Sequence, residues 1–147
     1  MRLREIMTET PTTITAETTV ARARSAMKTA GVHHLVVMES TAIAGLVSDR
    51  DIRNLNGTLP VSAVMSAKIA TASPDTTVRE AANILRGRSI GSLPIVEKGR
   101  LVGIVTTSDL LTLLGRGAER PIAESTRWTL RKRGPRRKAN EAVSRSL

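Results

Sequence analysis

The chain contains an internal repeat. Residues 6–53 align without a gap with residues 64–111 at a fixed offset of 58 positions, and 11 of the 48 aligned pairs are identical. Composition alone would give about four identities in such a window, so the two segments are copies of one unit. Each copy is too short to bury much apolar surface by itself, so the two must pack together about a pseudo-twofold axis. Such a body has two related clefts, where functional residues are expected.

The second copy begins with helix and hairpin patterns. Thr77 and Glu80 have capping-box spacing ahead of a stretch with helical periodicity, which predicts a helix over about residues 76–88. Two β-branched runs, residues 93–96 and 101–105, are joined by a turn that contains glycine. This pattern predicts a β-hairpin.

The last helix of the second copy is expected over residues 108–114, with its end at Gly115. The first copy predicts the same order: a helix over 20–30, strands over 34–38 and 43–47, and a short helix from Arg50. Short extended pieces are expected ahead of each first helix, over 12–15 and 69–73. The predicted fold class is therefore α/β, two β-α-β-β-α repeats related by a pseudo-twofold axis and followed by a basic C-terminal tail. The expected boundaries are 1–57 for the first repeat, 58–115 for the second and 116–147 for the tail.

Composition excludes several kinds of chemistry. The chain has no Phe, no Tyr and a single Trp, which removes the aromatic platforms on which single-stranded nucleic acids stack. It also has no cysteine, which rules out disulfides and thiolate chemistry and fits a reducing compartment. No apolar run is long enough to cross a membrane, and no signal-like block follows Met1. These features predict a cytoplasmic protein without a membrane span.

Positive charge is concentrated in the tail. The net charge is +10, and residues 116–147 hold 10 Lys and Arg against 3 Glu, which is +7. Most of these cations lie in residues 127–138. The segment could be a solvated extension or a contact for nucleic acid, an acidic protein or a membrane surface. Trp128 and Leu130 could instead anchor it on the body or on a partner.

A Gly-apolar-Val-Ser/Thr-x-x-Asp motif ends the hairpin of each copy, at residues 45–51 and 103–109. It lies where a strand runs into a helix, so its hydroxyl is at a helix N-terminus, which favours an anion such as phosphate. Three residues later, a carboxylate can accept the hydrogen bonds of a vicinal diol, as acids do for ribose. The same spacing is also a helix capping box. Its occurrence at equivalent positions in both copies favours a ligand role.

The order of elements, this repeated motif and residues 89–96 (Ser-Ile-Gly-Ser-Leu-Pro-Ile-Val) resemble a tandem pair of cystathionine-β-synthase (CBS) domains, or Bateman module, over roughly residues 3–115. Such modules bind adenosine nucleotides in two clefts between the repeats and pass the signal to a partner. The resemblance implies that Asp51 and Asp109 each hold a ribose diol, with Ser48 and Thr106 on phosphate. It also implies that each cleft takes residues from both copies. The Asp109 cleft would use Thr12, Thr13 and Val32, and the Asp51 cleft Ala70, Thr71 and Ile90.

His33 and His34 fall where kinase-subunit members of that family place a His-Arg pair on phosphate. Alternatively, one histidine faces the core and the other faces solvent. The equivalent positions in the second copy, Gly91 and Ser92, are uncharged, and Ser108 replaces the cation Arg50. The resemblance therefore implies two clefts of unequal affinity for polyphosphate.

Neither a catalytic group nor a metal site is predicted. Asp49 and Asp51 could be read as a metal pair, but residue 49 becomes Thr107 in the second copy. The two histidines are adjacent, so on a strand they point to opposite faces. The chain has no Gly-x-Ser-x-Gly motif and no cysteine nucleophile.

The resulting hypothesis is a non-enzymatic regulatory module that binds an adenosine nucleotide such as AMP, ADP or ATP, without a catalytic cofactor, and signals to a protein partner. The sequence does not choose among these nucleotides, S-adenosylmethionine and a dinucleotide. A homodimer is expected through small and aliphatic helix residues, namely Ala23, Ala26, Met27, Leu110 and Leu113. Two alternatives remain open. The protein could associate with nucleic acid through its tail and use the pair for dimerisation, or the pair could be structural and bind no ligand.

Overall fold

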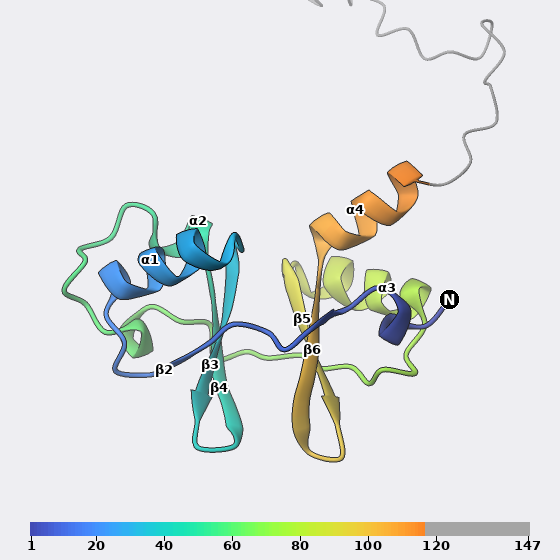
Figure 1. Cartoon of the computed structure of the whole chain (residues 1–147), viewed down its shortest axis with the longest axis horizontal. Coiled ribbons are helices and arrows are strands. Elements are labelled where there is room, and N and C mark those ends of the chain that lie inside the picture. The colour runs from blue at the N-terminus through green and yellow to red at the C-terminus, as the bar shows by residue number, and fades with distance from the viewer. Residues whose placement is uncertain (117–147) are drawn as a thin grey trace, which may run out of the picture. The chain divides into compact units, whose positions relative to one another are not determined.

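The computed structural model describes residues 1–116 (Figure 1). The predicted tail lies, beyond its first residue, outside this range. The first repeat comprises β2 (Thr13–Thr15), α1 (Val20–Ala30), β3 (His34–Glu39), β4 (Ala42–Ser48) and α2 (Asp49–Ile52). The second comprises α3 (Val78–Arg88), β5 (Ser92–Glu97), β6 (Arg100–Thr106) and α4 (Thr107–Arg116). A two-residue strand, β1 (Thr8–Glu9), and two single 3-10 turns, Leu3–Glu5 and Val61–Ala63, lie in the segments that precede α1 and α3.

The helices begin and end where side-chain chemistry requires. At α1, Thr19 accepts a hydrogen bond from the Arg22 amide, and Gly31 ends the helix with a left-handed φ of 67°. At α3, the predicted capping box is present, because Thr77 and Glu80 bond each other's backbone amides. The mixed α/β class and the repeated order of elements are confirmed.

Two details of the prediction are wrong. Helix α4 does not end at Gly115 but continues to Arg116, because a glycine permits a helix end without enforcing one. Residues 69–73 do not form a strand like Thr13–Thr15. They contribute a single bridge, Ala72 to Ile95, so only one of the two expected extended pieces becomes a full strand.

The sheet of the second repeat takes its edge strand from the N-terminal segment. One sheet has the order β2-β3-β4, with β2 parallel to β3. The other has the order β1-β6-β5, and its edge strand β1 comes from the N-terminal segment, where Thr8 pairs with Ile104. The N-terminal segment therefore starts beside the second repeat and crosses to the first (Figure 1). The pairing of β1 with β6 therefore links the two repeats.

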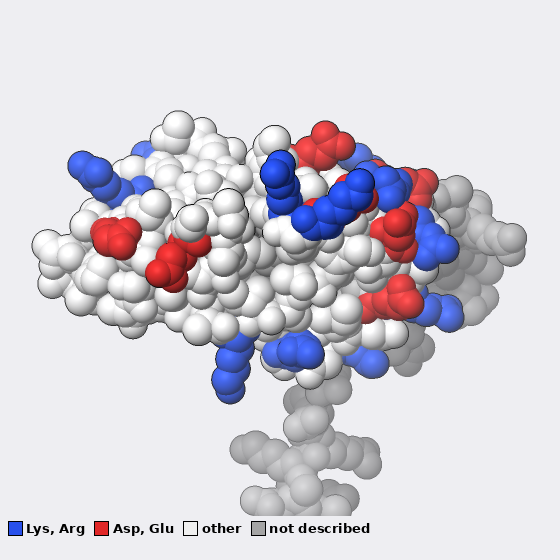
Figure 2. Space-filling view, turned by 90° about the horizontal axis from the view of Figure 1, so that it is seen from below, with Lys and Arg blue, Asp and Glu red and all other residues white. Residues whose placement is uncertain are grey.

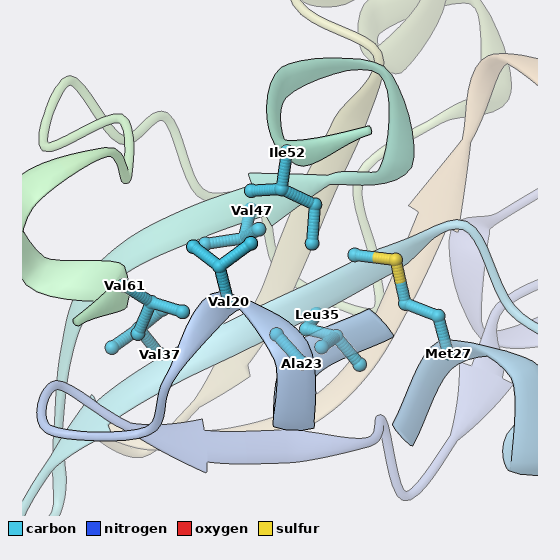
Figure 3. Close-up of a cluster of buried hydrophobic side chains, with 8 residues drawn as sticks. All are labelled: Val20, Ala23, Met27, Leu35, Val37, Val47, Ile52 and Val61. Atoms are coloured by element: carbon cyan, nitrogen blue, oxygen red, sulfur yellow. The ribbon is translucent and has the colours of Figure 1, made fainter. Parts of the chain in front are cut away.

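Each repeat buries its own apolar cluster. In the first, α1 packs on the β3–β4 hairpin (Figure 3), with these eight residues at the centre: Val20, Ala23, Met27, Leu35, Val37, Val47, Ile52 and Val61. Ala23 is fully buried and Met27 is 4% exposed. The expectation that these two residues lie on a dimer surface is therefore wrong, because the chain's own core covers them. Aliphatic side chains alone fill this core, as the lack of Phe and Tyr requires.

A third cluster joins the hairpins of the two repeats. It is built from Val36, Leu46 and Ile104, with partly buried side chains from both hairpins around it. Because its members come from β3, β4 and β6, the cluster fixes the two strand ends that carry the Ser/Thr-x-x-Asp motifs relative to each other.

Two equivalent segments cross between the repeats. Residues 65–72 run from Ser66, which exchanges two backbone hydrogen bonds with Leu46 of β4, to Ala72, which bonds β5. Residues 7–14 do the same from β6 to β3 in the opposite direction. Figure 1 shows both crossings. Each segment thus closes one side of the space between the repeats.

Candidate functional site

The two repeated motifs form matching helix caps. The Asp51 amide donates to Ser48 Oγ at 3.2 Å, and the Ser48 amide donates to Asp51 Oδ2 at 3.3 Å. The second motif repeats this geometry, with distances of 3.2 and 2.8 Å between Thr106 and Asp109. These bonds show that each motif caps a helix. They leave the second carboxylate oxygen and the hydroxyl proton of each motif available to a ligand.

A cavity of about 600 Å³ lies beside the first of these caps. Its lining comes from the end of β4 and helix α2, from the crossing segment, and from the α3–β5 turn and the start of α4. Both repeats therefore contribute to it, as expected of a cleft between them. A volume of this size accommodates a nucleotide-sized ligand.

The cavity gathers about half of the predicted site residues. Those that line it are Ser48, Arg50, Asp51, His33, His34, Ile90, Gly91 and Ser108. Thr106 and Asp109 cap α4 without lining this cavity, and Thr12 and Thr13 lie at β2, where the Thr12 carbonyl bonds Val36. Val32 packs partly against the first core and borders a smaller recess with His33. Ala70 is buried in the second core, and Thr71 is exposed but does not line the cavity.

Some cavity residues were not anticipated from the sequence. Ser66 and Lys68 come from the crossing segment, Ser89 from the turn after α3, and Arg53 from the end of α2. The resemblance placed Ala70 and Thr71 of the crossing segment at the Asp51 cleft, but no pattern at Ser66 or Lys68 indicates that these two residues line it. Only the comparison of the two copies could have indicated Lys68, because this lysine aligns with the uncharged Thr10.

His34 and His33 both line the cavity but differ in exposure. His33 is exposed, whereas His34 is half-buried at the start of β3, where it pairs with Ser48. A Cβ on Gly91 would lie only 3.1 Å from His34 Cε1, so the ring lies directly against the second repeat. Burial lowers the pKa of His34, with a smaller contribution from His33, while Asp51 and Asp109 act in the opposite direction. His34 therefore lies between the first motif and the start of the second repeat's hairpin.

Asp49 is paired within its own helix. Arg53 donates to Asp49 Oδ2 at 2.7 Å, and this hydrogen bond lowers the pKa of the Asp49 carboxyl. The contact spans one helical turn and is partly exposed, so it contributes little to stability. The pairing with Arg53 gives a structural role to Asp49, which is replaced by Thr107 in the second copy. Within residues 1–116, no three His, Asp or Glu side chains come together as metal ligands.

Arg24 holds helix α2 in place. Its guanidinium donates to the backbone carbonyls of Ile52, Arg53 and Leu55, at 2.6 Å for the shorter bond to Ile52. Ile52 is the last residue of α2, and Arg53 and Leu55 follow it, so the guanidinium binds carbonyls at and just beyond the helix end. The second copy has Ala82 at the equivalent position, so α1 anchors α2 in a way that α3 cannot anchor α4.

The two repeats carry little excess charge. Residues 1–115 contain 13 Lys and Arg and 10 Asp and Glu, a difference of +3. Over the face shown in Figure 2, basic side chains are interspersed with acidic ones. Local charge around the cavity therefore matters more than a general positive field. No helix in residues 1–116 combines the length and apolar character needed to cross a membrane.

Comparison with known proteins agrees with this architecture. The family model of the CBS domain matches residues 3–56 and 61–116. The CBS domain-containing protein YhcV of Bacillus subtilis is 32% identical over 114 residues, which cover 74% of this chain and 81% of that protein. Inosine-5'-monophosphate dehydrogenase of Thermoplasma acidophilum is 35% identical over 101 residues, which cover 68% of this chain but only 21% of the enzyme.

Solved structures give the same result. An uncharacterized conserved protein from Pyrococcus horikoshii superposes with a TM-score of 0.71 at 28% identity, covering 81% of this chain and 96% of that one. A CBS domain pair solved in complex with 5'-methylthioadenosine and S-adenosyl-L-methionine gives a TM-score of 0.73 at 23% identity, covering 78% and 96%, which shows a shared fold. With two matched domains and two matching sheets, the chain belongs to the CBS domain family and carries a tandem pair of its domains.

Proposed function

We propose that this CBS pair is a non-enzymatic sensor that binds an adenosine nucleotide between its repeats and signals to a partner protein. The observation that carries the proposal is the cavity at the first motif. It combines a carboxylate, a hydroxyl and several cations with residues of both repeats. A ligand held there contacts both halves at once, so its presence can change how they pack.

The chemistry of the first motif suits a ribose phosphate. Only one oxygen of Asp51 is used by the cap, so the other can accept hydrogen bonds from a ribose diol. Ser48 accepts from the Asp51 amide and still has a hydroxyl proton to donate to a phosphate oxygen. Ile90 and Leu46 supply apolar surface for the base. AMP, ADP and ATP share all of these groups.

Two features of relatives support an adenosine ligand. The solved pair of similar fold was crystallised with 5'-methylthioadenosine and S-adenosyl-L-methionine, both of which contain adenosine. CBS pairs also occur within larger enzymes such as inosine-5'-monophosphate dehydrogenase, where the pair is one part of the chain. By analogy, we infer that this pair acts on a separate partner, and as a homodimer.

The alternative is that the tail binds nucleic acid while the pair serves as a dimerisation scaffold. Ten Lys and Arg in residues 116–147 favour it. Such binding would weaken steeply with salt and disappear in a protein that ends at Gly115. A pair that binds neither nucleotide nor nucleic acid would instead be structural.

Calorimetry with adenosine, AMP, ADP and ATP tests the proposal, using protein shown by mass spectrometry to be free of bound ligand. We expect micromolar dissociation constants, on the order of −8 kcal/mol. Asp51→Ala and Asp109→Ala should each remove a charge-assisted contact to ribose, worth about 1.5–3 kcal/mol per hydrogen bond. Affinity at the affected cleft should therefore fall by about tenfold or more.

The same substitutions also remove a helix cap, so a matched control is needed. Glu80→Ala removes an equivalent capping carboxylate from α3, which does not line the cavity. It should cost similar stability and leave nucleotide affinity unchanged. The proposal fails if ligand-free wild-type protein gives no binding heat with any of the four compounds.

A further inference from the structure

We propose that the Asp51 cleft, and not the Asp109 cleft, selects phosphorylated ligands, and that Lys68 is the residue that sets this selectivity. The inference rests on the proposed function and deepens it, because it assigns different ligand classes to the two clefts. It follows from the positions of Lys68 and Thr10, the aligned middle residues of the two crossing segments.

Lys68 lies at the middle of the segment that closes the Asp51 cleft. On one side, Ser66 is fixed to Leu46 of β4 by two backbone hydrogen bonds of 2.9 and 3.0 Å. On the other side, Ala72 donates to Pro94 and accepts from Val96, both on β5. The segment therefore spans from one repeat to the other, and Lys68 lines the cavity beside Ser48 and Asp51.

The other cations of the cavity are less able to discriminate phosphate. Arg53 is already paired with Asp49 at 2.7 Å. Arg50 is exposed on α2, and its position is tied to the short helix that carries Asp51. Within residues 1–116, no carboxylate lies within 4.0 Å of the Lys68 ammonium group. Its charge is therefore available to an anion that enters the cavity.

Phosphate at this position would also improve the charge balance of the cavity. With the Asp49–Arg53 pair neutral, the remaining ionised side chains of the lining are Arg50, Lys68 and Asp51. They leave one excess positive charge before any protonation of the histidines. A phosphate group near Ser48 would meet Lys68 from the crossing segment and Arg50 from α2, on different elements.

The Asp109 cleft lacks this arrangement at every equivalent position. The fixed offset of 58 aligns uncharged residues of the second motif's copy with the cations and histidines of the first: Thr10 with Lys68, Ser108 with Arg50, Leu111 with Arg53, and Gly91 and Ser92 with the two histidines. Of these, Ser108, Gly91 and Ser92 line the Asp51 cavity itself. The crossing segment also bends differently there, because Thr10 has a positive φ of 51° and its hydroxyl bonds the Glu9 carbonyl. The second motif keeps its carboxylate and its Thr106 hydroxyl but has no cation at the equivalent positions, so ribose recognition should be retained while phosphate recognition is weakened. The Asp109 cleft should accordingly accept an uncharged nucleoside.

The test is calorimetry on the full chain with adenosine and AMP, for wild type, Lys68→Gln, Lys68→Arg and Lys98→Gln. Lys68→Gln should weaken AMP binding at one cleft by about tenfold and leave adenosine binding unchanged. Lys68→Arg keeps the charge and should keep most of the AMP preference. Lys98→Gln removes an exposed lysine at the distal β5–β6 turn, outside the cavity, and should behave as wild type. Lys68 is exposed, so thermal unfolding of the Gln variant without ligand should match that of wild type.

Combining Lys68→Gln with Asp51→Ala or Asp109→Ala in a double-mutant cycle shows at which cleft Lys68 affects AMP affinity. In an Asp51→Ala background, Lys68→Gln should cause little further loss of AMP affinity, whereas with Asp109→Ala the two effects should add. An unchanged AMP-to-adenosine ratio in Lys68→Gln overturns the inference while adenosine binding upholds the proposed function. An equal loss of AMP affinity in the Asp51→Ala background also overturns it. If wild type binds none of adenosine, AMP, ADP and ATP, the proposed function itself fails.

Discussion

His34 is a cavity residue whose charge depends on its surroundings. Burial against the second repeat lowers its pKa below the ordinary value of 6.5, so the ring is neutral at neutral pH. The unfolded chain then binds a proton more readily than the folded chain. Without ligand, this group contributes stability that is present above pH 6.5 and is lost as pH falls through the lowered pKa.

Ligand binding should reverse the preference of His34. A phosphate beside the ring favours the protonated form, so affinity for AMP gains a contribution as pH falls below about 6.5. The gain cannot exceed about tenfold per pH unit for one proton. The phosphate itself titrates with a pKa near 6, so the contribution of His34 is the difference between the wild-type and His34→Gln profiles.

Calorimetry with AMP and adenosine from about pH 7.5 to 5.5 measures this difference. His33→Gln measures separately the contribution of the exposed His33, which also lines the cavity but does not lie against Gly91. Superimposable AMP profiles for wild type and His34→Gln would assign His34 a packing role only. The same profiles would leave the Lys68 proposal intact, because that proposal is tested by the AMP-to-adenosine ratio of Lys68→Gln at a single pH.

At the scale of elements, the glycines of the repeated motif have a packing role. A Cβ on Gly45 would lie 2.6 Å from Met65 Sδ and 2.9 Å from the Ser66 carbonyl oxygen. Gly103 meets Met7 and Thr8 in the same way. The identical Gly and Met pairs of the two copies therefore let each crossing segment press onto a strand. Glycine at this point serves the closure of the cleft and need not touch a ligand.

Gly45→Ala should destabilise the protein by about 1–3 kcal/mol, because the Ser66 carbonyl belongs to a fixed backbone bridge that cannot yield. Gly87→Ala is the matched control, since Gly87 is helical in α3 and a Cβ there meets nothing within 4 Å. That substitution should stabilise by about 0.5–1 kcal/mol. Urea unfolding midpoints at constant m-value measure both. Equal changes of the same sign would show that the crossing segment moves freely.

Local patterns predicted the regular elements, but they could not predict contacts made across the repeats. Helices α1 and α3 follow from capping residues and periodic apolar positions, which are properties of short windows. The pairing of β1 with β6 joins residues almost a hundred positions apart, and no window contains both. For the same reason Ser48, Asp51 and Gly91 were foreseen from the motif and the resemblance, whereas Lys68 was not.

At the scale of the whole molecule, helix α4 presents an apolar face that the described residues do not cover. Leu110 packs partly against the second core, while Leu111 and Leu114 are 63% and 75% exposed. On a helical wheel, Leu113 and Leu114 lie on the same side as Leu110, and Thr112 lies opposite. The dimer surface expected from the sequence is therefore confined to this helix and to the partly buried Ala26, since Ala23 and Met27 are core residues.

We expect two copies of the chain to pair through this face of α4. A second copy is a suitable occupant because a twofold contact matches the same leucines with each other. Light scattering should give about twice the chain mass of 15.8 kDa, independent of dilution over the micromolar range. Leu114→Glu would place a carboxylate in an apolar contact and should shift the mass toward that of one chain. Thr112→Glu adds the same charge on the opposite side of α4 and should leave the dimer intact. A single-chain mass for wild type, or an equal response to both substitutions, would contradict pairing through α4.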